Sequence, residues 1–211
     1  MDSMPAGVTV IDHPLVRTKL TRLRDKNTPS EEFRRLVREV AALMAFEATR
    51  TLETADIEID TPLARYAGKK LARPVVIAPI LRAGLGFSDG IAAALPDAAF
   101  GHIGIYRDEE TALPESYYFK MPPHVAQSDV LVVDPMLATG GSSVSAIEKI
   151  KELGVTRIRF VCLVSCPEGI KKLRDAHPDV PVFTAEIDEK LDDRSYIVPG
   201  LGDAGDRYFG T

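Results

Sequence analysis

The segment that most constrains this chain is residues 130–143, which have the pattern of a strand, a loop and the start of a helix. Its first four residues are apolar and three are β-branched, as in a strand buried on both faces of a sheet. Asp134 and Pro135 end the strand, because proline cannot donate a hydrogen bond to a neighbouring strand. The Thr-Gly-Gly-Ser-Ser run that follows offers hydroxyls and accessible amides just before helical periodicity begins at Val144. This arrangement predicts a binding site for an anion.

The expected anion is a phosphorylated sugar rather than a nucleoside triphosphate. No Gly-Lys-Ser/Thr sequence follows the glycines, so the loop lacks the lysine of a Walker A motif. An acid at the strand end followed by Thr-Gly-Gly suits a ribose phosphate, with Asp134 accepting hydrogen bonds from ribose hydroxyls while the loop holds the 5-phosphate. A plain glycine-rich turn between strand and helix does not need acid, hydroxyl and glycine in this order.

A second strand end carries a similar loop. Residues 75–80 are predicted to form a buried strand, and residues 81–86 lead from it into a helix over residues 87–95. Arg82 offers a forked guanidinium to a pyrophosphate, and Gly84 allows close approach of the backbone. We therefore predict a second phosphate-type loop here.

The remaining patterns alternate between strands and helices, which implies a parallel sheet with right-handed crossovers. The expected strands are residues 98–106, 157–164 and 180–185, and the expected helices are residues 15–23, 30–51 and 167–176. We predict an α/β fold in one domain of 211 residues, with a parallel central sheet flanked by helices. To it we add a helical N-terminal extension (about 1–53), a movable arm (about 107–125) and a C-terminal segment (about 187–211). Ligands of such sheets lie beyond the carboxyl ends of the strands, where both loops fall.

The net charge and the cysteine and histidine content limit the classes of protein to which this chain can belong. The net charge of −5 argues against a large surface for nucleic acid or anionic membrane. The first residues lack a secretory signal pattern and no apolar run approaches membrane-spanning length, so we expect a cytoplasmic protein. Cys162 and Cys166 fit neither a CxxC pair nor a zinc set, and we predict buried free thiols. The four histidines are scattered without metal-ligand spacing.

A literal GxGxxG occurs near the C-terminus at Gly200, Gly202 and Gly205. Only six residues follow Gly205, which leaves no room for the helix, strand and ribose-binding acid of a dinucleotide site. We reject that interpretation. A glycine-rich terminal loop with exposed main chain could instead form hydrogen bonds to the edge of a base.

Two motifs resemble those of one family. Residues 132–142, Val-Val-Asp-Pro-Met-Leu-Ala-Thr-Gly-Gly-Ser, are similar to the phosphoribosyl-pyrophosphate (PRPP) motif of the uracil phosphoribosyltransferases. Residues 80–86, Ile-Leu-Arg-Ala-Gly-Leu-Gly, match the same family, and the similarity runs from His13 to Gly210. The resemblance implies a type I phosphoribosyltransferase fold and a pentosyltransferase of pyrimidine salvage. Such an enzyme transfers 5-phosphoribose from PRPP to N1 of uracil, giving UMP and diphosphate.

The resemblance also implies the site residues. The PRPP-binding residues are Arg82, Arg107, Asp134, Pro135, Met136, Leu137, Ala138, Thr139, Gly140, Gly141, Ser142 and Asp203. The uracil-binding residues are Ile197, Gly202, Asp203 and Ala204. Arg82, Arg107 and Asp203 are the implied catalytic residues, with Arg107 reaching the pyrophosphate as the arm closes over the site. Backbone groups of the terminal loop complement O2, N3-H and O4 of uracil.

Magnesium is expected as the cofactor, bound mainly through PRPP. Many phosphoribosyltransferases carry two adjacent acids at the strand end, whereas the second position here is Pro135, as in the uracil branch. That proline removes a carboxylate, so we name no residue as a direct metal ligand. The resemblance further implies a homodimer or homotetramer, with the N-terminal helices as contacts. The resemblance also suggests GTP as an effector, but no residue of this sequence indicates whether the protein responds to it.

Two alternatives stay open at this point. The first is a regulatory protein on the same scaffold that binds RNA, against which the acidic balance speaks. The second is a phosphoribosyltransferase for another base, such as hypoxanthine or orotate. The carboxylate of orotate calls for a cation near the base loop, and only Arg207 is a nearby candidate.

Overall fold

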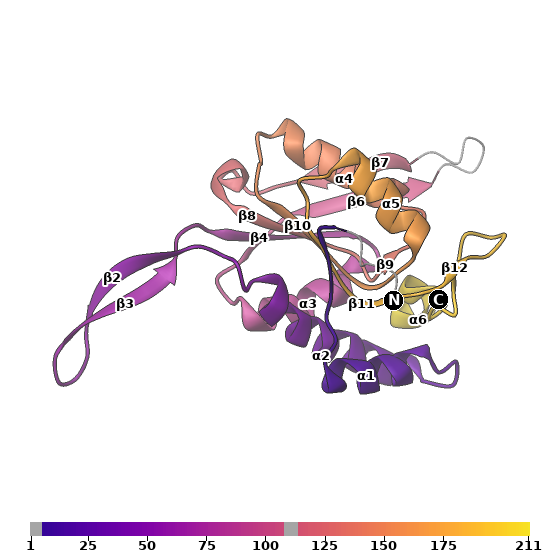
Figure 1. The fold of residues 1–211 in the computed structure, drawn as a ribbon, viewed down its shortest axis with the longest axis horizontal. Coiled ribbons are helices and arrows are strands. Elements are labelled where there is room, and N and C mark those ends of the chain that lie inside the picture. Colours follow the sequence, from indigo (N-terminus) through magenta and orange to yellow (C-terminus); the bar gives the residue numbers. More distant parts are fainter. Residues whose placement is uncertain (1–5, 108–113) are drawn as a thin grey trace.

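The protein, in a computed structural model that describes residues 6–107 and 114–211, is built on one large sheet (Figure 1). Its strand order is β1-β11-β10-β8-β4-β6-β7, and every neighbouring pair is parallel except β6 and β7. The strands are β1 (Val8–Val10), β4 (Val75–Leu81), β6 (His102–Arg107), β7 (Pro114–Lys120), β8 (Asp129–Val133), β10 (Ile158–Ser165) and β11 (Val182–Ile187). Short strands β5 (Ala99–Phe100) and β9 (Met136–Leu137) pair with β4 and β10. The predicted α/β fold with a parallel central sheet is confirmed.

Helices cover both faces of this sheet (Figure 1). On one face lie α1 (Pro14–Arg24), α2 (Ser30–Ala48) and α3 (Gly84–Ala94); on the other lie α4 (Gly141–Glu152) and α5 (Pro167–Ala176). Strand β8 shows why its sequence is continuously apolar. Leu131 and Val133 pack into the core under α1 to α3, while Val130 and Val132 pack into the core under α4 and α5. A strand that is buried on both faces has no polar side to present.

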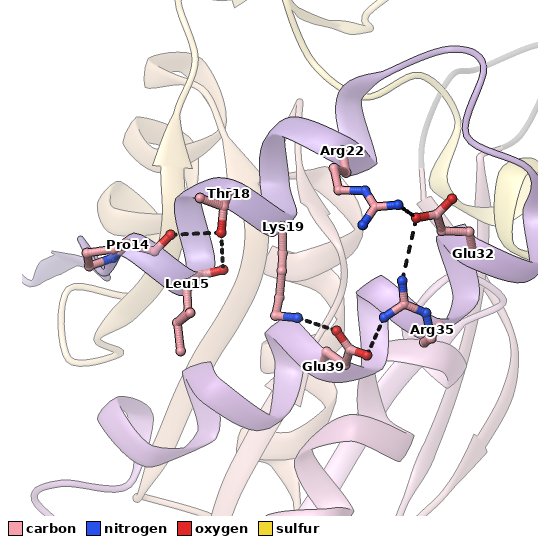
Figure 2. A network of polar contacts seen from close by, with 8 residues as sticks. All are labelled: Pro14, Leu15, Thr18, Lys19, Arg22, Glu32, Arg35 and Glu39. Atoms are coloured by element: carbon pink, nitrogen blue, oxygen red, sulfur yellow. Dashed lines mark hydrogen bonds and ion pairs between the residues drawn. The ribbon is translucent and has the colours of Figure 1, made fainter.

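The N-terminal segment contains the expected helices, but it is not wholly helical. Strand β1 joins the central sheet beside β11, with Val8 opposite Val182. Three residues are too few to show a strand pattern in the sequence, and the partner strand is remote along the chain. Helices α1 and α2 are joined by ion pairs of Arg22 with Glu32 and of Lys19 with Glu39, to which Arg35 adds further contacts (Figure 2).

The polar region before the main sheet forms a hairpin of β2 (Thr54–Asp60) and β3 (Arg65–Leu71). It projects away from the body of the protein (Figure 1). Ile57 and Ile59 alternate with acidic residues, a pattern that is typical of a strand, and both lie in β2. At its tip Leu63 is 96% exposed.

The predicted arm over about 107–125 is in large part an extension of the central sheet. Strands β6 and β7 are antiparallel, with Ile103 opposite Phe119, and η1 (Val125–Gln127) follows. Residues 108–113 lie outside the described part, as do the side chains of Arg107 and Pro114. Closure of the arm over a substrate therefore stays a prediction.

Two helix starts differ from the sequence-based prediction. Helix α3 begins at Gly84 and α4 at Gly141, each three residues earlier than expected. The periodic apolar pattern that reveals a helix starts only after the glycine and serine residues of its first turn. No helix in the described ranges is long and apolar enough to cross a membrane.

Candidate active site at the carboxyl edge of the sheet

Three of the predicted site segments, those of Arg82, Arg107 and Asp134, lie where β4, β6 and β8 end. Strands β4 and β8 are neighbours, with Pro79 opposite Val133, so the Arg82 and Asp134 loops leave the sheet side by side. Strand β6 lies on the other side of β4 and ends at Arg107. After β4 the chain continues to β6 on one side of it, and the later strand β8 lies on its other side. Open α/β sheets bind ligands at such a switch point in the strand order.

The backbone of the Asp134 loop is tied to β10. The Pro135 carbonyl accepts hydrogen bonds from the amides of Leu163 and Val164, at 3.0 and 3.1 Å. The next two residues form β9, which pairs with β10. Gly140 then takes a left-handed φ of +76° as the residue before α4, a conformation that glycine adopts without strain. The first-turn amides of α4 thereby point out of the loop, ready for an anion.

Helix α5 supports the same loop from behind, which the sequence did not reveal. The Cys166 Sγ donates a hydrogen bond to the Ala138 carbonyl at 3.1 Å. A Cβ on Gly169 would stand 2.3 Å from that carbonyl oxygen, and a Cβ on Gly140 would stand 3.0 Å from the Gly169 oxygen. The ammonium of Lys172 lies 3.7 Å from where a Cβ on Gly141 would be. The loop is therefore fixed by close packing, with a positive charge beside it.

The hydroxyls of the loop have different tasks. Buried Ser143 donates to the Gly140 carbonyl at 3.1 Å, so its hydroxyl stabilises the turn. Among the hydrogen bonds of residues 6–107 and 114–211, none engages the hydroxyl of Thr139 or Ser142. These two hydroxyls remain free to donate to a phosphate.

Asp134 is electrostatically unusual. Burial at the strand end raises the pKa of its carboxyl to about 7 because the charged form is poorly solvated there, and the negative charge of Asp203 adds to the rise. The amide of Met136, 3.4 Å from Oδ1, acts in the opposite direction. Although the two acids come from segments far apart in the chain, the structure brings Asp134 and Asp203 close enough to interact.

Arg82 lies at the end of β4 with its side chain directed toward the C-terminal helix α6 (Ala204–Phe209). Its Nη2 is 3.3 Å from Asp206 Oδ1, and its guanidinium lies over the Phe209 ring at 5.6 Å. Gly84 was expected to let the backbone approach a pyrophosphate. A Cβ there would meet the Val133 carbonyl at 2.7 Å, so this glycine allows α3 to pack against β8; its approach to a pyrophosphate stays a prediction.

The C-terminal segment consists of a small hairpin of β12 (Lys190–Leu191) and β13 (Ile197–Val198), a glycine-rich turn and α6. The side chains of Ile197 and Ala204 are buried in the core, which leaves their main chain as the part that a base could contact. Asp203 caps α6, its Oδ1 accepting from the Asp206 amide at 2.8 Å. Gly202 has a φ of +76°. Helix α6 begins at Ala204, within the GxGxxG pattern, and so contains its last glycine, Gly205.

Arg207 serves the fold rather than a ligand carboxylate. Its guanidinium donates to the carbonyls of Leu23, Leu201 and Asp25 and lies over the Phe33 ring at 4.4 Å. Burial lowers its pKa from the usual value. The cation that would have favoured orotate is thus committed to linking the N-terminal helices with the C-terminal turn.

Cys162 and Cys166 are free and buried, as predicted. Burial raises the pKa of Cys162 to about 12 and that of Cys166 to about 11. In the described part of the chain, no group of three or more His, Cys, Asp or Glu side chains is arranged to hold a metal ion.

A family model described as uracil phosphoribosyltransferase matches residues 10–211 of the chain. The chain belongs to this family. A curated uracil phosphoribosyltransferase from Alkaliphilus oremlandii is 58% identical over 205 residues, covering 97% of this chain and 98% of that protein. Another from Staphylococcus aureus (strain Newman) is 53% identical with the same coverage. The predicted resemblance to the uracil phosphoribosyltransferase family is confirmed.

Solved structures agree with this family. The AQ2163 protein from Aquifex aeolicus superposes with a TM-score of 0.92 at 33% identity, covering 97% of this chain and 98% of that one. Adenine phosphoribosyltransferase from Leishmania tarentolae superposes with a TM-score of 0.59 at 16% identity, covering 88% and 93%. The second likeness shows the type I phosphoribosyltransferase fold alone. Membership of the uracil phosphoribosyltransferase family favours a pentosyltransferase over the RNA-binding regulator.

Proposed function

We propose that this protein is a uracil phosphoribosyltransferase that joins uracil N1 to the phosphoribosyl group of PRPP, giving UMP and diphosphate. The observation that carries the proposal is the meeting of three segments at one sheet edge. These are the Asp134 loop with its free helix amides, the Arg82 loop beside it, and the Asp203 turn, whose charge reaches Asp134. Family membership over residues 10–211 supports the same conclusion.

On the donor side, the amides of Gly141 and Ser142 and the Thr139 hydroxyl hold the 5-phosphate, and the dipole of α4 favours its charge. Asp134 accepts hydrogen bonds from the ribose hydroxyls. Pro135, Met136, Leu137, Ala138 and Gly140 shape the loop and hold it against β10. Lys172 lies close enough to the first turn of α4 to add to the positive potential there.

On the diphosphate side, Arg82 and Arg107 stabilise the charge that develops as the bond to C1 of ribose breaks. The ion pair of Arg82 with Asp206 is exposed at both ends, so releasing it costs little. Loss of diphosphate leaves an oxocarbenium-like ribose, and uracil N1 attacks its C1 with no covalent enzyme intermediate, while the N1 proton leaves with the released diphosphate. The protein supplies position and charge rather than a nucleophile.

On the base side, main-chain groups of the segment from Ile197 to Ala204 complement the acceptor, donor, acceptor edge of uracil, with Gly202 giving close approach. Cytosine reverses this pattern at positions 3 and 4, and unpaired buried groups then give discrimination of roughly 10⁴ to 10⁵ in favourable sites. The bonds of Arg207 to main-chain carbonyls argue against orotate.

Magnesium fits this site as a companion of the donor. Asp134 and Asp203 are oxygen ligands of the type that Mg²⁺ prefers, and Mg²⁺ retains several waters when it binds with phosphates. Bound with PRPP, the ion would neutralise charge on the leaving diphosphate. We propose that these two acids act on it through its waters, consistent with proline in place of a second acid at residue 135.

A homo-oligomer is the proposed assembly, as a dimer or tetramer. The β2-β3 hairpin carries exposed apolar side chains, including Leu63 and Tyr66, and an isolated hairpin is marginally stable in water. Phe46 on α2 is also exposed, beside a cavity of about 630 Å³. We expect Leu63→Asp to reduce the mass measured by light scattering; a monomeric wild-type protein would contradict the proposal. A GTP effector and a cytoplasmic location remain predictions.

The test of the reaction is product formation. Purified protein with uracil, PRPP and Mg²⁺ should release UMP and diphosphate in equal amounts, measured by chromatography and a coupled diphosphate assay. Ala substitution of Thr139 should raise the KM for PRPP and leave the KM for uracil nearly unchanged. Absence of UMP would refute the function, whereas UMP formation with an unchanged KM for PRPP in this variant would refute only the placement of the donor.

A further inference from the structure

A buried ion pair between distant parts of the chain lies beside the turn that carries Gly202. Asp188 follows β11, and its side chain is 2% exposed. Its carboxylate accepts two hydrogen bonds from the guanidinium of Arg24, at 2.8 and 2.5 Å. Arg24 is the last residue of α1. A buried bidentate pair of this kind requires that both partners hold a fixed position.

The same two side chains hold both polar groups of Gly200. The Gly200 amide donates to Asp188 Oδ2 at 2.9 Å, and its carbonyl accepts from Arg24 Nη1 at 2.7 Å. The position requires glycine, because Gly200 has a φ of +60° and a Cβ there would stand 2.0 Å from the Ile197 oxygen. The peptide groups on either side of Gly200 are thus set by the ion pair.

Arg207 holds the next residue by the same means, with a bond of 2.8 Å to the Leu201 carbonyl. Within the described part of the chain, no backbone hydrogen bond uses the amides of Gly202 or Asp203 as donors. The turn is therefore anchored through Gly200 and Leu201, while the two following amides remain available to a ligand.

We propose that Arg24 and Asp188 are positioning residues for base recognition: together they fix the Gly200 peptide so that the following amides face the edge of uracil. This inference rests on the proposed role of the segment from Ile197 to Ala204 in binding uracil. The pair touches no reacting atom. Its effect is to keep the binding-competent turn populated, since the apparent affinity falls with the competent fraction.

The test compares Arg24→Lys with Arg22→Lys. Both substitutions lie on α1 and keep the charge, and lysine at residue 24 leaves Asp188 paired but loses the fork that also reaches Gly200. The Arg22 side chain is 60% exposed and pairs with Glu32 of α2 (Figure 2). It is therefore a matched control. Asp188→Asn, which is isosteric, provides a second variant if Arg24→Lys folds poorly.

We expect Arg24→Lys and Asp188→Asn to raise the KM for uracil by roughly tenfold or more, while the KM for PRPP changes by less than about threefold. Arg22→Lys should change neither. An unchanged KM for uracil, or an equal rise in both KM values, would overturn the positioning role. Gly202→Val separates the placement of uracil from the positioning role of Arg24 and Asp188. If Gly202→Val leaves the KM for uracil unchanged, the placement of the base is wrong. If Gly202→Val raises this KM and Arg24→Lys does not, only the positioning role is rejected.

Discussion

Replacing Asp134 by asparagine should make the protein more stable and less active at the same time. Asparagine has the same size as aspartate and keeps an oxygen that can accept from the Met136 amide, which lies 3.4 Å from Asp134 Oδ1 in the wild-type protein. It removes the carboxyl whose pKa is raised from 3.8 to about 7 by burial and by the charge of Asp203. The expected gain comes from no longer ionising a poorly solvated acid.

The sign and size of this effect depend on pH. Between about pH 4 and pH 7 the unfolded chain ionises Asp134 while the folded protein keeps it protonated, so the stability of the wild-type protein falls as pH rises. Above about pH 7 the loss is complete. A pKa change of 1 corresponds to about 1.4 kcal/mol, so the asparagine variant should gain about 4 kcal/mol at most at pH 8 and about 1 kcal/mol at pH 4.5.

Urea unfolding at the two pH values measures the difference, and Asp129→Asn at the other end of β8 is the control. Asp129 is paired with Arg159 at 3.2 Å and is 7% exposed, so its neutralisation should destabilise the protein. Asp134→Asn should also lower kcat/KM for PRPP roughly tenfold to a hundredfold, since hydrogen bonds to a charged group contribute about 1.5 to 3 kcal/mol. An equal gain at both pH values, or no gain at pH 8, would refute the electrostatic reasoning.

Other predictions concern the loop and the thiols. Gly140→Ala and Gly154→Ala share a positive φ, of +76° and +80°, and should each lose about 1 to 2 kcal/mol of stability in urea unfolding. Only Gly140→Ala should raise the KM for PRPP, because nothing lies within 4 Å of a Cβ at Gly154; equal KM values in the two variants would contradict this. Gly169→Ala should raise the KM for PRPP without touching the ligand, since its Cβ would lie 2.3 Å from a loop carbonyl; unchanged kinetics would count against the packing argument. Alkylation of Cys162 and Cys166 at pH 8 should be slow in the native protein and fast in urea, because burial raises their pKa to about 12 and about 11; rapid labelling of the native protein would show that the thiols are accessible.

Local patterns were sufficient to predict the parallel strands at the centre of the sheet and the loop that begins at Asp134. An apolar run, a proline and a glycine pair act within a few residues, so their meaning is contained in the segment itself. Parallel strands bring their carboxyl ends to one edge of a sheet, and this rule predicted that the Arg82 and Asp134 loops lie at the same edge.

Contacts between distant residues were beyond the reach of those patterns. Arg24 and Asp188 are an ordinary helix-terminal arginine and an ordinary acid in the sequence, and only the folded chain joins them. Gly84 illustrates a different difficulty. The sequence indicated a close approach at Gly84, and the structure shows that the Val133 carbonyl is one group that a side chain there would meet. The approach of a pyrophosphate stays a prediction. The sequence identifies where space is required and not what fills it.

The most direct test of the central claim is a comparison of bases with a common donor. Initial rates with PRPP and Mg²⁺ should be measured for uracil, cytosine, orotate and hypoxanthine under the same conditions. We predict that uracil is the preferred substrate, with kcat/KM for each other base lower by roughly 10³ or more. Turnover of orotate or hypoxanthine at a rate comparable to uracil would contradict the account of how the C-terminal turn recognises its base.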